Sequence, residues 1–223
     1  TTLFRSCPNG LCVFRWLPRR SDDDASQDDR GARLRRRRAT GAYERTPDPQ
    51  LSARDNEFMA LMPKGEPDKE FLRYMVDDPT GQPPGTIVVE TKKRMLYYVL
   101  PNKKAMRYGV ALGRNSFGWT GEAVIHHKAE WPAWNPPAEM IARWPHVHAV
   151  DGGPNNPLGA RAMYLGSSVY RIHGTNDPTT IGKFVSSGCI RMTNEDVTDL
   201  FSRVDVGTKV VVLPKNAPLE ARG

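Results

Sequence analysis

The sequence of 223 residues is poor in cysteine and has no long hydrophobic run. Only three cysteines occur, and two of them, Cys7 and Cys12, flank a short turn-forming segment and could pair in an oxidising compartment. Cys189 would then be the single unpaired thiol. The apolar stretch of residues 11–17 is too short and too interrupted to cross a membrane, and no lipid-attachment motif surrounds Cys7. This stretch therefore predicts neither a membrane span nor a lipid anchor.

A convincing set of metal ligands is also missing. His146 and His148 would project to one side of a strand, and His126 and His127 would add candidates. No cysteine or acidic residue completes the four-ligand pattern that zinc prefers. We therefore expect loop or surface histidines, no metal and no cofactor.

Hydrophobic residues make up 39% of the chain, which is low for a compact protein, and the first sixty residues account for much of the deficit. Residues 21–29 are acidic and polar, residues 33–38 are almost all arginine, and residues 46–49 resemble a linker. We predict a low-complexity, largely disordered extension over 1–60. A linker follows over 61–84, in which residues 68–76 could form a short helix, and a C-terminal tail covers 215–223.

The arginine cluster could suggest a nucleic-acid partner. An acidic cluster precedes it, however, and no motif of a nucleic-acid-binding fold follows it. We therefore expect a solvated tail and no nucleic acid. The formal net charge of +7 would suit an anionic cell-wall or lipid surface through non-specific attraction, without identifying a partner.

Residues 85–214 have the pattern of a mainly β domain. Short β-branched and aromatic runs alternate with polar, Gly and Pro breaks, as expected of strands. The expected strands are residues 86–91, 95–100, 105–112, 123–127, 169–173 and 209–213, and the first two would form a hairpin. Thr193 and Asp196 have the spacing of a capping box before an apolar helical face. The pattern predicts a β-sandwich or barrel with one or two short helices.

Cys189 and His173 are the candidates for catalysis. His173 lies sixteen residues before Cys189, so that a thiol and a base fall on neighbouring segments. The thiol needs such help, because its reference pKa of about 8.5 leaves it mostly protonated near neutrality. Gly188 removes a side chain where a substrate carbonyl would approach the sulfur. This combination favours acyl transfer through a cysteine.

Three polar residues near the thiol have alternative interpretations. Arg191 lies two residues beyond the sulfur and would point to the same side of an extended segment. It could clamp a substrate carboxylate, stabilise the thiolate or form a structural ion pair. Ser186 and Ser187 could be a polar turn, or their hydroxyls could bind substrate or orient the loop.

These residues resemble the L,D-transpeptidase catalytic domain, also called the YkuD family. Its signature is a histidine followed by a Ser/Thr-x-Gly-Cys-hydrophobic-Arg segment, which here follows His173 and runs from Ser186 to Arg191. The Asn-Pro-Leu-Gly run of residues 156–159 is similar to a stretch that precedes the histidine in many relatives. Residues 116–121 replace a Thr-Pro-x-Gly turn, which would alter one wall of the cleft. The resemblance covers roughly residues 85–214 and implies an L,D-transpeptidase-like β-sandwich.

The resemblance also implies a reaction on peptidoglycan stem peptides. Relatives cleave the bond between the third-position diamino acid and D-Ala of a tetrapeptide, form a thioester and pass the acyl group to an amine. By this resemblance Cys189 is the nucleophile and His173 the base, and the backbone carbonyl of Gly174 fixes the histidine tautomer. The backbone N–H groups of Gly188 and Cys189 are the implied oxyanion donors.

The acceptor amine would decide the product. A second diamino acid gives a 3-3 crosslink, an envelope protein gives attachment to the wall, and a D-amino acid gives exchange. Hydrolysis by an L,D-carboxypeptidase and a non-catalytic peptidoglycan-binding module are the alternatives. The implied substrate predicts a bacterial periplasmic location, with a signal peptide either removed or not included, since the chain begins at Thr1. The oligomeric state stays open.

Overall fold

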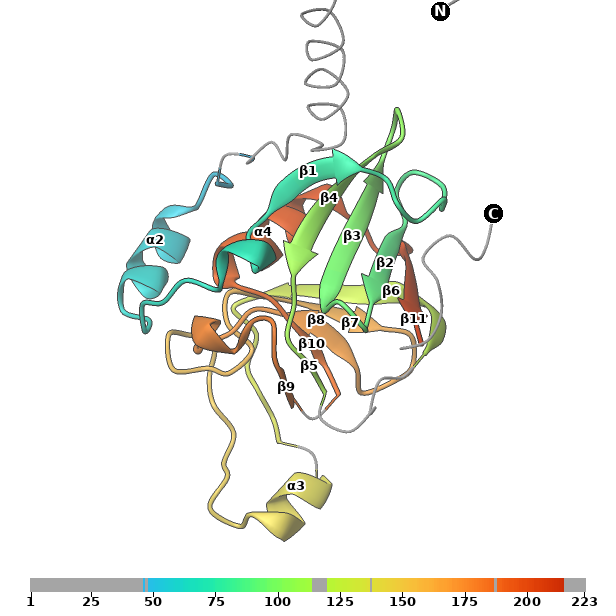
Figure 1. Cartoon of the computed structure of the whole chain (residues 1–223). Coiled ribbons are helices and arrows are strands. Elements are labelled where there is room, and N and C mark those ends of the chain that lie inside the picture. Colours follow the sequence, from blue (N-terminus) through green and yellow to red (C-terminus); the bar gives the residue numbers. More distant parts are fainter. Residues whose placement is uncertain (1–45, 47, 114–119, 137, 187, 215–223) are drawn as a thin grey trace, which may run out of the picture. The chain divides into compact units, whose positions relative to one another are not determined.

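A computed structural model describes residues 46, 48–113, 120–136, 138–186 and 188–214 (Figure 1). Most of the expected extension, Cys7, Cys12, Ser187, most of the replaced turn and the C-terminal tail lie outside these residues.

Nine strands of the described part form one curled sheet in the order β1-β4-β3-β2-β11-β6-β7-β8-β10 (Figure 1). Their bounds are β1 Tyr74–Asp77, β2 Ile87–Glu90, β3 Met95–Leu100, β4 Lys104–Gly109, β6 Gly121–Glu130, β7 Arg161–Leu165, β8 Arg171–His173, β10 Ile190–Arg191 and β11 Lys209–Leu213. A parallel pair, β5 Leu112–Gly113 and β9 Phe184–Ser186, is separate. The helices are α2 Ala53–Ala60, α3 Ala138–Arg143 and α4 Asn194–Arg203, with the 3-10 turns η1 Lys69–Phe71 and η3 Pro178–Thr180.

The predicted hairpin is confirmed. Strands β2 and β3 pair antiparallel, with Ile87 opposite Tyr98 and Glu90 opposite Met95. Strand β11 then joins the two halves of the sheet, because it runs parallel to β2 and antiparallel to β6. The C-terminal apolar run therefore joins the strands on either side of it into one sheet. The mainly β fold with short helices is confirmed.

Both faces of the sheet are covered at its centre. All four residues of β2 are buried, and alternation sends Ile87 and Val89 into the main core and Val88 into a second cluster with Phe71. The apolar face of α4 closes the main core through Val197 and Leu200, neither of which is exposed. Burial on both faces therefore explains why residues 87–89 of β2 are all apolar and β-branched, without polar alternation.

The capping box expected before α4 is half formed. The Asp196 N–H donates to the Thr193 hydroxyl over 3.1 Å, so Thr193 is the N-cap. The Asp196 carboxylate instead contacts Arg73, with 3.2 Å between Nη1 and Oδ1. Burial raises the pKa of Asp196 to about 7, although Arg73 opposes this.

The structure differs from two expectations for the N-terminal region. Residues 53–60, expected within a disordered extension, form helix α2, which begins with a complete capping box between Ser52 and Asp55. Residues 68–76, expected as a short helix, form η1 and then β1. Strand β1 extends because it completes the sheet edge, with Met75 opposite Met106 of β4. Tertiary contacts override local helix preference in this segment.

Candidate active site

Strands β8 and β10 bring the candidate histidine and cysteine segments together. They pair parallel, with Ile190 opposite Ile172 and Arg191 opposite His173. Ile172 and Ile190 face the core, so alternation places His173 and Arg191 on the other face of the sheet. Cys189 lies directly before β10, so continuing this alternation would put its side chain on the side of Arg191. The histidine and cysteine candidates therefore come from two neighbouring parallel segments, with Arg191 directly opposite His173.

His173 is buried and its ring is oriented by the main chain. Its Nδ1 lies 2.6 Å from the Gly174 carbonyl oxygen. Since a carbonyl can only accept, this contact requires the tautomer with the proton on Nδ1 and leaves the lone pair on Nε2. Burial, and then the positive charge of Arg191, lower the pKa of His173 to about 3, although backbone contacts with Gly174 and, more weakly, Leu158 oppose them. The ring is consequently neutral near neutral pH.

Cys189 is half-buried, and its thiol contacts the carbonyl oxygen of Val169, with 3.9 Å between Sγ and O. Within the described residues no hydrogen bond joins the thiol to the His173 ring. Catalytic hydrogen bonds are often loose before substrate binds. Proton transfer to His173 would therefore require the thiol to turn away from Val169.

Ser186 shapes the loop that carries the thiol. Its buried hydroxyl donates to the Cys189 carbonyl over 2.6 Å and accepts from the Gly188 N–H over 3.3 Å. Gly188 has a φ of +126°, a conformation that side-chain-bearing residues rarely adopt. Of the interpretations of Ser186, the geometry supports loop orientation. The Gly188 N–H is occupied by Ser186, so an oxyanion role for it would require this contact to be exchanged for substrate.

Arg191 is held at the site by its backbone. Its N–H and carbonyl exchange hydrogen bonds of 2.9 and 2.8 Å with Ala111. Its guanidinium donates to the Thr180 hydroxyl over 3.2 Å, and no acidic side chain of the described residues lies within ion-pair distance. Burial lowers the pKa of Arg191, with Asp177 and Cys189 opposing this. A structural ion pair, one of the three interpretations of Arg191, would need an acidic partner, and the described residues provide none.

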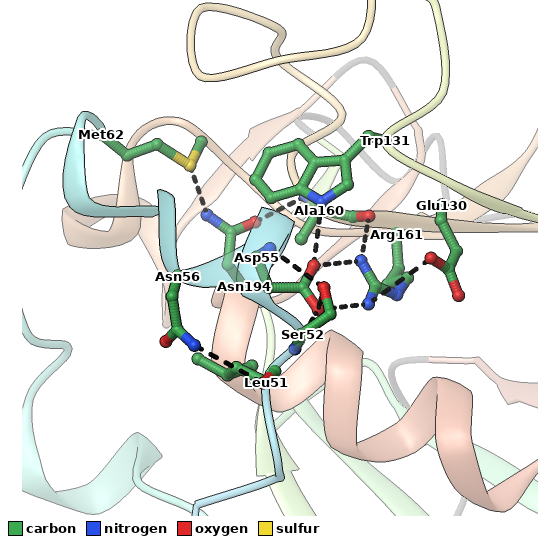
Figure 2. A network of polar contacts seen from close by, with 10 residues as sticks. All are labelled: Leu51, Ser52, Asp55, Asn56, Met62, Glu130, Trp131, Ala160, Arg161 and Asn194. Carbon is green, nitrogen blue, oxygen red and sulfur yellow. Dashed lines mark hydrogen bonds and ion pairs between the residues drawn. The ribbon is translucent and has the colours of Figure 1, made fainter. Parts of the chain in front are cut away.

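A buried polar network around Asp55 and Asn194 was not predicted (Figure 2). The Asn194 side chain binds the backbone of Ala160 and Thr175, and Asp55 pairs with Arg161. No local signal could have found these contacts, because they join residues that are 19 to 106 positions apart. Trp131 is buried and donates its indole N–H to Asp55 over 2.9 Å.

No group of three or more His, Cys, Asp or Glu side chains in the described part of the chain could hold a metal ion. None of the helices there is both long enough and apolar enough to cross a membrane.

Fold and site together define a curled, mainly β domain that presents a histidine, a cysteine and an arginine at the end of two parallel strands. Residues 84–212, more than half of the chain, match the YkuD family, described as the L,D-transpeptidase catalytic domain. The chain belongs to this family.

Known proteins agree with this assignment. A putative L,D-transpeptidase in the ATP synthase subunits region of Fuscovulum blasticum is 44% identical over 93 residues, which cover 42% of this chain and 49% of that protein. The putative L,D-transpeptidase YqjB of Bacillus subtilis is 36% identical over 140 residues, which cover 60% of this chain and 74% of YqjB. For most of the curated relatives, the matched part is about half of their own length.

A crystal structure described as a probable carnitine operon oxidoreductase from Brucella melitensis is 47% identical. The match covers 71% of this chain and 99% of that one, with a TM-score of 0.45.

Proposed function

We propose that the protein is a cysteine-dependent L,D-transpeptidase that acts on peptidoglycan stem peptides in the bacterial periplasm. The main support is the arrangement of Cys189 and Arg191 on a segment next to a buried, neutral His173 whose Nδ1 is held by Gly174. Family membership supports a peptidoglycan substrate.

The first half-reaction forms a thioester. The Cys189 thiol gives its proton to His173 Nε2, and the sulfur attacks the carbonyl carbon of the third-position diamino acid. The backbone N–H of Cys189, and that of Gly188 once released by Ser186, stabilise the developing oxyanion. The C–N bond to D-Ala then breaks, and the imidazolium returns the proton to the leaving amine. Gly174 stabilises the charged ring through its carbonyl.

The second half-reaction releases the enzyme. An acceptor amine attacks the thioester carbonyl, His173 accepts a proton from that amine, and the thiol re-forms as the C–S bond breaks. The acceptor could be a diamino acid of a second stem, an envelope protein or a free D-amino acid. Water as acceptor would instead make the protein an L,D-carboxypeptidase.

Arg191 supplies positive charge on the substrate side. In this proposal its guanidinium binds a stem-peptide carboxylate and stabilises the thiolate electrostatically. Because the described residues provide no carboxylate partner for it, the group can turn to substrate without breaking an ion pair.

The direct test incubates the purified protein with a disaccharide tetrapeptide and follows products and protein mass by mass spectrometry. Wild type should release D-Ala and carry a transient adduct on Cys189. Cys189→Ala should do neither, and His173→Gln should be slower by about 10²- to 10⁴-fold. His126→Gln, which replaces an exposed histidine, is the matched control and should retain the wild-type rate.

Equal turnover by Cys189→Ala would overturn the proposal. Binding of the tetrapeptide without turnover by wild type would indicate a non-catalytic wall-binding module. A carbapenem provides a second probe, since it should form an adduct on the same sulfur. Added acceptor amines distinguish transfer from hydrolysis by the mass of the product.

A further inference from the structure

The peptide bond between Gly174 and Thr175 is anchored from both of its polar ends. Its carbonyl oxygen lies 2.6 Å from His173 Nδ1, and its N–H donates to Asn194 Oδ1 over 3.2 Å. In a trans peptide these two groups point in opposite directions in one plane, and the described chain contains no cis peptide bond. The group that fixes the Thr175 N–H therefore also aims the carbonyl at the histidine.

The Asn194 side chain binds this part of the backbone through both of its polar atoms. Its Oδ1 also accepts from the Ala160 N–H over 3.0 Å (Figure 2). Its Nδ2 donates to the Thr175 carbonyl over 2.7 Å. Two N–H donors on one side and a carbonyl on the other determine which amide atom is oxygen. Asn194 is buried, so these contacts satisfy amide groups that burial removes from solvent.

Two glycines leave the space that the amide needs. A Cβ built on Gly174 or on Gly159 would collide with Asn194 Oδ1. Any larger residue at either position would push the amide away from the Gly174–Thr175 peptide. The close approach of backbone and amide is therefore built into the local sequence.

Helix α2 and the residues after it hold the network from outside the family-matching residues 84–212. The Nδ2 of Asn194 also donates to Met62 Sδ over 3.1 Å, and Met62 packs with Trp131 and Ala160 in a small buried cluster. Asp55 of α2 binds Arg161, whose backbone carbonyl accepts the Gly174 N–H over 3.0 Å. Residues 174 and 175 are thus bound by Asn194 of α4 and by the backbone of Arg161, whose side chain is anchored by α2.

We propose that Asn194 is a positioning residue for His173: it aims the Gly174 carbonyl, which selects the Nδ1-protonated ring, and the α2 segment holds Asn194 in place. The catalytic consequence rests on the proposed function, because only a histidine that acts as the base needs this tautomer. The structural part, the selection of one tautomer, does not depend on any reaction.

The test compares Asn194→Ala with Thr198→Val. Thr198 lies on the same helix and is also buried, but its hydroxyl has no hydrogen-bond partner in the described part of the chain, so its replacement removes no hydrogen bond. Met62→Leu is a milder third variant, because it keeps the volume and removes only the sulfur. Thermal unfolding is measured for each, so that the comparison uses folded protein.

The first readout is the ¹⁵N spectrum of the His173 ring in selectively labelled protein. Wild type and Thr198→Val should show a protonated Nδ1 and an unprotonated Nε2. Asn194→Ala should show a mixture of tautomers, and Met62→Leu a smaller change in the same direction. An unchanged wild-type tautomer in folded Asn194→Ala would overturn the proposal, as would an equal change in Thr198→Val.

The second readout is the rate of D-Ala release. Asn194→Ala should lose kcat on the order of 10²-fold, as expected for a misplaced catalytic group, with KM unchanged. Should Asn194→Ala fail to fold, Met62→Leu provides both readouts, and a wild-type tautomer with a wild-type kcat would then overturn the proposal. Absence of Cys189-dependent release by wild type would refute the proposed function alone, while the ring spectrum would still decide whether Asn194 positions His173.

Discussion

Asp55 and Arg161 form a buried ion pair through two parallel contacts, Oδ1 to Nη1 and Oδ2 to Nη2, each 2.8 Å long. The pair joins α2 to β7, and both side chains are almost fully buried. Burial alone would raise the pKa of Asp55, but hydrogen bonds from Arg161, Ser52 and Trp131 hold it well below its usual value. The carboxylate is therefore charged throughout the physiological range, and its removal leaves a buried guanidinium without its main partner.

Asp55→Ala should lower the free energy of unfolding by about 3–5 kcal/mol, because breaking one side of a buried pair leaves an uncompensated charge. The control is Asp77→Ala, which breaks an ion pair of 2.7 Å with Lys104 on the protein surface. That loss should stay below about 1 kcal/mol, since water screens exposed pairs. Urea denaturation of both variants measures the difference, and equal losses would contradict the role assigned to Asp55.

The acid limb of kcat/KM should lie well below pH 6.5. The folded protein lowers the pKa of His173 to about 3, so the neutral base persists as the pH falls through the range in which a free histidine would become charged. Rates of D-Ala release between pH 4 and pH 8 test this. A loss of rate with an apparent pKa of 6.5 or higher would show that the ring is not buried and neutral as described.

Arg191→Gln should move this acid limb toward higher pH. Removing the positive charge removes the second largest cause of the lowered pKa of His173, after burial. Arg171→Gln is a graded control, because Arg171 acts in the same direction but ranks lower among the causes. The acid limb of Arg171→Gln should move less than that of Arg191→Gln. A larger movement for Arg171→Gln would contradict the placement of Arg191 opposite His173.

Gly159→Ala should destabilise the protein more than Gly81→Ala. The two glycines have almost the same φ, +64° and +65°, so the left-handed backbone costs each alanine about 1–2 kcal/mol. At Gly81 the added methyl group meets open space, whereas at Gly159 it would meet the backbone of Gly174 and Thr175. Overpacking should add about 1–3 kcal/mol there. Equal unfolding free energies for the two variants would show that the backbone of Gly174 and Thr175 moves to accommodate the methyl group at little cost.

Several elements could be predicted because their cause is local. The β2–β3 hairpin follows from two β-branched and aromatic runs around a polar break, and the start of α4 follows from Thr193 as N-cap. Strand β7 was missed, since its five residues carry no clear alternation, and β1 was mistaken for a helix. Both are strands because long-range pairing supplies their hydrogen bonds: β7 pairs with β6 and β8, and β1 pairs with β4.

The sequence by itself determined the order and spacing of His173, Gly188, Cys189 and Arg191, and with them the family, because a short motif needs no knowledge of distant contacts. Only the tertiary structure decided what surrounds them. It placed Asn194 against the peptide that follows Gly174, and it brought Asp55 to Arg161 across 106 residues. Such contacts depend on how the sheet curls and where α2 docks, and the residues involved carry no mark of them in their immediate neighbours.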